Sequence, residues 1–177
     1  MTEDDLRGRL LDAAAQLLDA DGADAVTIRE TARRCAVSHG APRRYFPSRT
    51  ALLGYLANRV AADLTADLDA TDGSARALAL AYVAFAARRP HAFDLLTRHD
   101  LVHASGAGLR SATLPLVERW RDAWRARHSA GTDADAIARL AAVHGVASLV
   151  SHRANEVIGI DPDDFVDLAL RTGGGHG

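Results

Sequence analysis

Three arginines lie close together in one short stretch of the chain. Arg43, Arg44 and Arg49 fall within "GAPRRYFPSR", which also holds two aromatic residues and no acidic one. Guanidinium groups bind phosphate oxygens and pair bidentately with O6 and N7 of guanine. Residues 27–49 carry six arginines against one glutamate, although the net charge of the whole chain is -2. A positive segment on an otherwise acidic chain predicts a local contact with nucleic acid.

A second segment has the spacing of metal ligands. His99 and His103 in "HDLVH" stand four residues apart, as in the H-E-x-x-H zinc proteases, with Asp100 in the place of the glutamate. Aspartate is one methylene shorter than glutamate, and no third ligand follows at a recognisable spacing. The two histidines are equally suited to hydrogen-bond a polar small molecule. A small helical metal-dependent hydrolase that uses this segment is therefore kept as the alternative function.

Other enzyme signatures are missing from the sequence. The chain has no nucleophile elbow, no phosphate-binding loop and no cysteine-based metal cluster. We expect no catalytic residues, no metal, no cofactor and no enzymatic activity.

Composition narrows the class of protein. The 177 residues, 48% of them hydrophobic, suffice for the core of one domain or of two small ones. The single cysteine, Cys35, cannot form an internal disulfide, and the acidic start of the chain is unlike a signal peptide. Apolar stretches such as "AAVHGVASLV" fall short of the roughly 20 residues of a membrane span. We expect a cytoplasmic protein without a membrane anchor.

Helical periodicity runs through nearly the whole chain and predicts an all-α fold of about nine helices. The first helix begins near Thr2 and ends at Gly22. A capping box of Thr27 and Glu30 begins a short second helix, and Ser38 is expected to cap a third. Pro42 would lie in the first turn of that third helix, where a missing N–H costs least. The "PS" pair at 47–48 then begins a fourth helix, which runs to the linker "DATDGS".

The second half of the chain repeats this pattern of helices and breaks. Helices are predicted over 75–89, stopped by Pro90, and over 91–99. A longer helix carries Pro115, Trp120 and Trp124, and another covers 132–157. An N-cap at Asp161 followed by proline begins the last helix, and the tail "GGGHG" is predicted to be disordered.

The two short helices joined by "CAVS" are typical of a helix-turn-helix. Small residues suit the turn because the two helices cross closely there. The outward face of the second helix, with Arg43 and Arg44, is then free to reach base edges or phosphates. A solvated basic face on a surface helix is the alternative, but it leaves the capping box, the turn, the aromatic pair and the local charge without a common cause.

Residues 7–57 resemble the DNA-binding domain of TetR-type transcriptional regulators, in the order helix, Gly, "TIRE", "AVS", Gly, "YF", a cap and two leucines. The resemblance implies DNA contacts from Thr27, Arg29, Ser38, His39, Gly40, Ala41, Arg43, Arg44, Tyr45 and Arg49. It places Thr27, Arg29, Tyr45 and Arg49 near phosphate groups. It places Phe46 in the core. The common "Thr-Leu-Tyr" is replaced by "Ala-Pro-Arg", so that Arg43 stands where the family has tyrosine. Arg43 would shift the sequence preference toward guanine, or contact a phosphate.

The rest of the chain resembles the family's effector domain in outline, including a subgroup with a Trp-His-Gly motif in which Val143 here replaces the tryptophan. The expected domains are a helix-turn-helix domain (1–48), a connecting helix and linker (49–72), an effector-binding and dimerisation domain (73–172) and a tail (173–177). The implied effector pocket would use Tyr82, Phe85, Phe93, His103, Trp120, Trp124 and His144. Aromatic residues at helical spacing are more often ordinary core.

Residues 136–150 form a helix that is apolar around most of its surface and must be covered on two sides. The family forms a four-helix bundle with a twin here, whereas a helix buried in its own subunit is the alternative. The implied interface residues are Leu140, Gly145, Ala147, Ser148, Phe165 and Leu168. The function that follows is that of a ligand-responsive homodimeric regulator, a repressor, which binds a palindromic double-stranded DNA operator and an unknown small-molecule effector.

Overall fold

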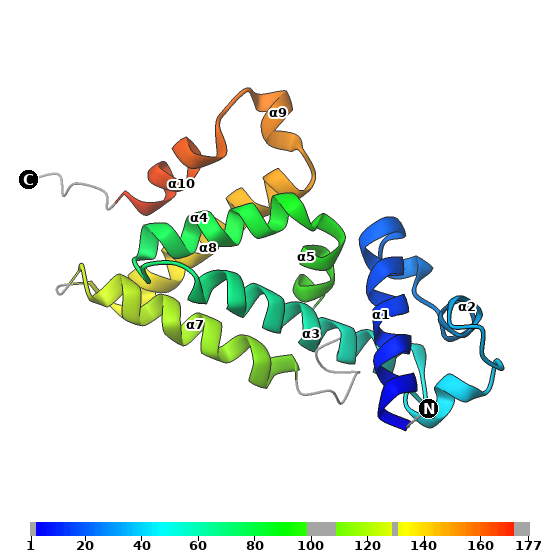
Figure 1. Ribbon diagram of the computed structural model, residues 1–177. Coiled ribbons are helices and arrows are strands. Elements are labelled where there is room, and N and C mark those ends of the chain that lie inside the picture. Colours follow the sequence, from blue (N-terminus) through cyan, green and yellow to red (C-terminus); the bar gives the residue numbers. More distant parts are fainter. Residues whose placement is uncertain (1–2, 99–108, 129–130, 172–177) are drawn as a thin grey trace, which may run out of the picture. The chain divides into compact units, whose positions relative to one another are not determined.

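The computed structural model describes residues 3–98, 109–128 and 131–171. These residues form nine α-helices and two 3-10 helices, and no strand occurs among them (Figure 1). The helices are α1 (Glu3–Asp21), η1 (Ala23–Ala25), α2 (Ile28–Arg34), η2 (Ala41–Arg44), α3 (Arg49–Asp69), α4 (Ala75–Arg88), α5 (Pro90–Thr97), α7 (Leu109–Arg125), α8 (Asp133–Ser151), α9 (Ala154–Ile158) and α10 (Pro162–Leu170). The all-α prediction is confirmed. The Thr2 cap, the His99–His103 segment and the glycine-rich tail lie outside the described residues.

The described residues belong to two compact units, defined by the contacts within each. One unit holds residues 1–63 with 89–113, and the other holds 64–88 with 114–177. The first unit takes in α5, which packs on α1, and most of α3. The long helix α3 contributes buried residues to both units.

In the first unit, one face of α1 supplies much of the core. Its buried side chains follow the predicted helical period: Leu10, Ala13, Ala14, Leu17 and Leu18. Gly22 ends the helix with φ 80°, a left-handed conformation that favours glycine. The sequence placed this end of α1 correctly.

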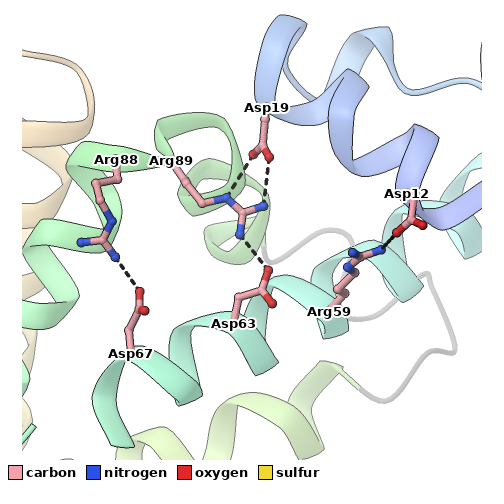
Figure 2. A network of polar contacts seen from close by, with 7 residues as sticks. All are labelled: Asp12, Asp19, Arg59, Asp63, Asp67, Arg88 and Arg89. Atoms are coloured by element: carbon pink, nitrogen blue, oxygen red, sulfur yellow. Dashed lines mark hydrogen bonds and ion pairs between the residues drawn. The ribbon is translucent and has the colours of Figure 1, made fainter. Parts of the chain in front are cut away.

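Ion pairs on the surface of the first unit join α1 to α3 and α5 (Figure 2). Arg89, which precedes α5, donates to Asp63 of α3 at 2.7 Å and to Asp19 of α1 at 3.1 and 3.2 Å. Arg59 of α3 donates to Asp12 of α1 at 2.5 Å. These carboxylates are partly exposed, so single pairs contribute little and the shared Arg89 cluster contributes more.

In the second unit, α8 packs against α4 and α10 (Figure 1). A capping box of Thr132 and Asp135 begins α8. Trp120 of α7 is 4% exposed and donates its indole N–H to the carbonyl of Ala136 at 2.7 Å. The start of α8 is therefore held both by its own cap and by the buried tryptophan.

The single helix predicted over 132–157 is wrong. α8 ends at Ser151, Arg153 has φ 57°, and α9 follows as a separate short helix. The Ser151 hydroxyl donates to the Ser148 carbonyl at 3.0 Å, and Nδ1 of His152 lies 2.8 Å from the same oxygen. The same oxygen also accepts the backbone N–H of His152 at 3.4 Å, and the left-handed conformation of Arg153 ends the helix although the apolar pattern continues.

α8 is long and apolar enough to cross a membrane, judged by length and composition only. The sequence had indicated no such stretch. One helix of this kind is weak evidence for a span, since core helices of soluble proteins pass the same test. Only 28% of its most apolar 18-residue window is buried within the chain.

Candidate functional site

Helix α2 begins at a side-chain cap. The Thr27 hydroxyl accepts the backbone N–H of Glu30 at 3.1 Å, and the Thr31 hydroxyl donates to the Thr27 carbonyl at 2.8 Å. The predicted capping box is only half formed, because the Glu30 carboxylate is bound by the guanidinium of Arg33. The cap fixes the first turn of α2, where Thr27 and Arg29 were expected to approach a phosphate.

The turn after α2 is a Schellman motif. The N–H of Val37 bonds to the Ala32 carbonyl and that of Ala36 to the Arg33 carbonyl, both at 3.1 Å. Ala36 has φ 54°, in the region where glycine is usual. Alanine has the smallest side chain after glycine, which agrees with the predicted need for small residues in this turn.

Residues 38–46, called the recognition segment below, contain the four-residue 3-10 helix η2 and do not form the predicted α-helix. Ser38 does not cap it; the N-cap is Gly40, which makes no side-chain cap bond. Pro42 lacks an N–H, and the neighbouring N–H groups bond three residues back, from Ala41 to Ser38 and from Arg43 to Gly40. Pro42 lies in the first turn of η2, as predicted, where its missing N–H costs least.

Buried residues hold the C-terminal end of this segment. Pro42 is buried, and Phe46 is fully buried, as predicted. The backbone N–H of Phe46 donates to the Pro42 carbonyl at 2.8 Å. The Phe46 ring meets Tyr55 of α3 edge to face at 5.6 Å. Tyr45 is half-buried, so part of its side chain remains available to a ligand.

Several expected DNA-contacting residues lie together on the surface. Arg29 and Arg33 of α2 and His39 of the recognition segment line a hollow of about 470 Å³ with Ala32 and Val37. Ser38, His39, Gly40, Arg43 and Arg44 are exposed, whereas Ala41 and Thr27 are half-buried. Arg29, Arg33 and His39 thus surround a hollow whose floor includes the apolar side chains of Ala32 and Val37.

The six arginines of this region divide into two groups. Arg33 holds Glu30 through two bonds of 2.7 and 2.8 Å, and Arg34 lies 3.4 Å from the same carboxylate. Arg49 donates to backbone carbonyls of the turn before α2. The side chains of Arg29, Arg43 and Arg44 make no hydrogen bond or ion pair with any described residue. Counting charges in the sequence thus overstated the number of free cations.

The two arginines hold the pKa of the Glu30 carboxyl far below its ordinary value. The hydrogen bond from Arg33 is the largest cause, and the carboxyl titrates at about 2. Glu30 is therefore ionised at every physiological pH and reduces the positive charge that α2 presents.

The residues expected to line an effector pocket fall into buried aromatics and one polar pair. Phe85, Phe93, Trp120 and Trp124 are at most 4% exposed and pack in the core, with the two tryptophans stacked at 6.2 Å. Phe93 belongs to the first unit, and His103 lies outside the described residues.

The polar pair joins α4 to α8. The Tyr82 hydroxyl lies 2.9 Å from Nδ1 of His144. Burial raises the pKa of Tyr82 to about 12, so its hydroxyl is neutral at physiological pH. Tyr82 and His144 are half-buried, unlike the four buried aromatic residues of the expected pocket.

The expected dimer interface needs one correction. Ala147 has no exposed surface and belongs to the core of its own unit. Leu140, Ser148 and Phe165 are half-buried, while Gly145 and Leu168 are exposed. A helix that is apolar on all sides has no polar face to mark the exposed side. Its sequence therefore does not distinguish the inward face from the outward one.

The exposed face of α8 includes residues that the sequence reasoning missed. Ala134, Ile137, Ala138 and Ala141 are exposed and continue to Gly145 at helical spacing. Beyond α8, Val157, Ile158 and Ile160 are exposed as well, with Val157 at 90%. The break at Arg153, which sequence periodicity did not indicate, sets these apolar residues apart from α8.

Comparison with known proteins relates both halves of the chain to one kind of regulator. The family described as "Bacterial regulatory proteins, tetR family" matches residues 10–56, and "Tetracyclin repressor-like, C-terminal domain" matches residues 75–172. A protein of unknown function from Rhodococcus sp. RHA1 is 30% identical, with a TM-score of 0.73 over 93% of this chain and 91% of that one. A TetR-like transcriptional regulator from the same organism, 18% identical, shares the fold with a TM-score of 0.69 over 96% and 93%.

Nucleoid occlusion factors SlmA from Actinobacillus pleuropneumoniae are 33% identical over 89 residues. That match spans 46% of this chain and 44% of theirs, so the chain covers less than half of these curated relatives.

The Glu30 cluster predicts an abnormal titration. Carbon-detected NMR should show Glu30 still ionised at pH 4, where an ordinary glutamate is more than half protonated, and titrating at about 2. Because the folded pKa lies below the unfolded one, the stabilisation by this pair is complete above about pH 4.5 and is lost as the pH falls toward 2. Arg33→Gln should raise the pKa toward its ordinary value. A wild-type Glu30 that titrates near 4.5 would contradict the pairing.

Proposed function

Because the chain belongs to the TetR family of bacterial regulatory proteins, we propose that it is a transcriptional repressor that binds a palindromic operator as a homodimer and leaves it when a small molecule binds. One observation carries the DNA-binding part of the proposal. The recognition segment presents Arg43 and Arg44 exposed and without a partner among the described residues, while Pro42 and Phe46 hold the segment in place.

The proposed contacts divide by chemistry. Arg43 stands where the family has tyrosine, and its guanidinium can pair with guanine in the major groove. Arg29 and the Thr27 end of α2 contact phosphate, which positions the protein without reading sequence. Ser38, His39, Gly40, Ala41, Arg44 and Tyr45 complete the surface.

A second copy of the chain is proposed to cover α8 and α10. The exposed face of α8 is apolar, and small residues let a partner helix come close. Leu168 of α10 is 57% exposed. Two-fold pairing would set the recognition segments about one duplex turn or more apart, which suits a palindrome.

The effector response is proposed to involve the Tyr82–His144 pair, the half-buried polar group among the expected pocket residues. A small molecule with an apolar body and one polar group would engage this pair. It can release the operator only if it binds the DNA-incompetent arrangement more tightly.

The experiment that tests the DNA-binding proposal is selection of bound duplexes from a random DNA pool. Enrichment of a palindrome supports it, and a search upstream of neighbouring genes then finds the operator. Absence of any enriched sequence together with absence of salt-dependent binding overturns it.

Substitutions of Arg43 and of Arg29 should weaken DNA binding in different ways. Arg43→Ala should cost about 1–3 kcal/mol on the selected operator and relax the preference at one base pair of each half-site. Arg29→Ala should weaken all duplexes alike and lower the slope of log affinity against log salt by about 0.9 for each copy in contact. Equal losses by Arg43→Ala on operator and random DNA would assign Arg43 to phosphate instead.

Gly145→Glu should separate the dimer without unfolding the subunit. A Cβ at Gly145 meets nothing within 4 Å in its own chain, so the subunit tolerates a side chain there. In the dimer the new carboxylate would be buried, which costs several kcal/mol. Sedimentation at micromolar concentration should show a monomer with the helical circular dichroism of the wild type. Ala66→Glu, at an exposed position of α3, is the control and should remain dimeric.

Ala147→Glu should instead unfold the subunit, since Ala147 is buried in its own core. A monomeric wild type, or a dimeric Gly145→Glu variant, would remove this face from the interface.

An effector that releases the operator should change tryptophan emission, because both tryptophans of the chain lie in α7 of the second unit. His144→Gln should lower its potency about tenfold, the equivalent of about 1.4 kcal/mol for one lost hydrogen bond. His152→Gln, at the exposed end of α8, should have no effect. Unchanged emission with full potency in Trp120→Phe and His144→Gln would place the effector elsewhere.

A further inference from the structure

Arg49, the first residue of α3, binds the turn that precedes α2. Its Nε donates to the Val26 carbonyl at 2.9 Å, and its Nη2 donates to the Ala23 carbonyl at 2.7 Å. The same Nη2 lies 3.4 Å from the Asp24 carboxylate. One edge of the guanidinium is therefore engaged by acceptors that lie within four residues of one another.

These acceptors lie in the turn that leads into α2. The turn runs from Gly22, where α1 ends, through η1 to the fully buried Val26 and the cap Thr27. The Val26 carbonyl precedes the cap, so the α2 ladder does not use it. Arg49 supplies a donor to this carbonyl from 23 residues further along the chain.

The geometry suits arginine and not lysine. Nε and Nη2 lie in one plane and donate in parallel, so a single side chain can bind two carbonyls. A lysine ammonium is a point donor and can replace only one of these bonds. By contrast, either cation would serve as a phosphate contact.

We propose that Arg49 is a positioning residue of the DNA-binding unit, which fixes the start of α2 relative to the start of α3, and not the phosphate ligand expected from the sequence. The proposal rests on the proposed DNA-binding function. α2 and α3 flank the recognition segment in the chain, so this bond sets the frame in which Thr27 and Arg29 meet the backbone of DNA.

The test compares Arg49→Ala and Arg49→Lys in the full-length protein, on the selected operator and on a random duplex. Both variants should weaken binding at least tenfold, while the slope of log affinity against log salt stays as in the wild type. The fraction of protein competent to bind is titrated for each variant, so that loss of folded protein is not counted as loss of affinity. Asp24→Asn is the matched control and should bind normally, because that carboxylate is fully exposed.

A second measurement needs no DNA. Amide hydrogen exchange at Glu30, whose N–H bonds to Thr27, should quicken in both Arg49 variants and stay unchanged in Arg43→Ala. A slope lowered by about 0.9 per copy in Arg49→Ala and restored in Arg49→Lys would make Arg49 a phosphate ligand and overturn the proposal. Unaltered affinity in both variants would also overturn it.

A wild type without salt-dependent DNA binding defeats the proposed function. In that case the exchange measurement alone decides whether Arg49 positions α2.

Discussion

A four-residue 3-10 helix is too short to hold its own position, so the candidate interface depends on the burial of Pro42 and Phe46. Forming a single helical turn fixes several dihedral angles for few hydrogen bonds and is unfavourable alone. Phe46 is fully buried and meets Tyr55 at 5.6 Å, which anchors the segment to α3. Arg43 and Arg44 can then stay exposed, because the buried Pro42 and Phe46 on either side hold the segment in place.

Backbone acceptors and one carboxylate sort the arginines of this region by task. Glu30 engages Arg33 and Arg34, and the turn before α2 engages Arg49. Arg29, Arg43 and Arg44 remain exposed beside arginines whose charge Glu30 partly neutralises. The cations of this region that have no carboxylate partner among the described residues then lie on the recognition segment and at the start of α2, where the proposed DNA contacts are.

Local signals were enough to predict most helices, and distant contacts account for what was missed. Adjacent residues are enough to predict four helix boundaries: the caps at Thr27 and Asp161 and the ends at Gly22 and Pro90. The carbonyl partners of Arg49 lie 23 and 26 residues away, and no local pattern marks them. The apolar α8 could be recognised as a helix, but which side faces inward depends on α4 and α10. Whether the expected site residues contact DNA or an effector remains a prediction.

In the proposed complex, the shortness of η2 limits how much DNA sequence one subunit can recognise. A segment of four residues in that complex would read few base pairs, and a short base sequence recurs by chance many times in a chromosome that offers on the order of 10⁶ or more competing sites. Identity of the bases in one half-site then carries too little information to single out a gene. In the proposed dimer, the distance between the two half-sites supplies the remaining specificity. A rigid dimer interface would accept a narrower range of half-site spacings than a flexible one.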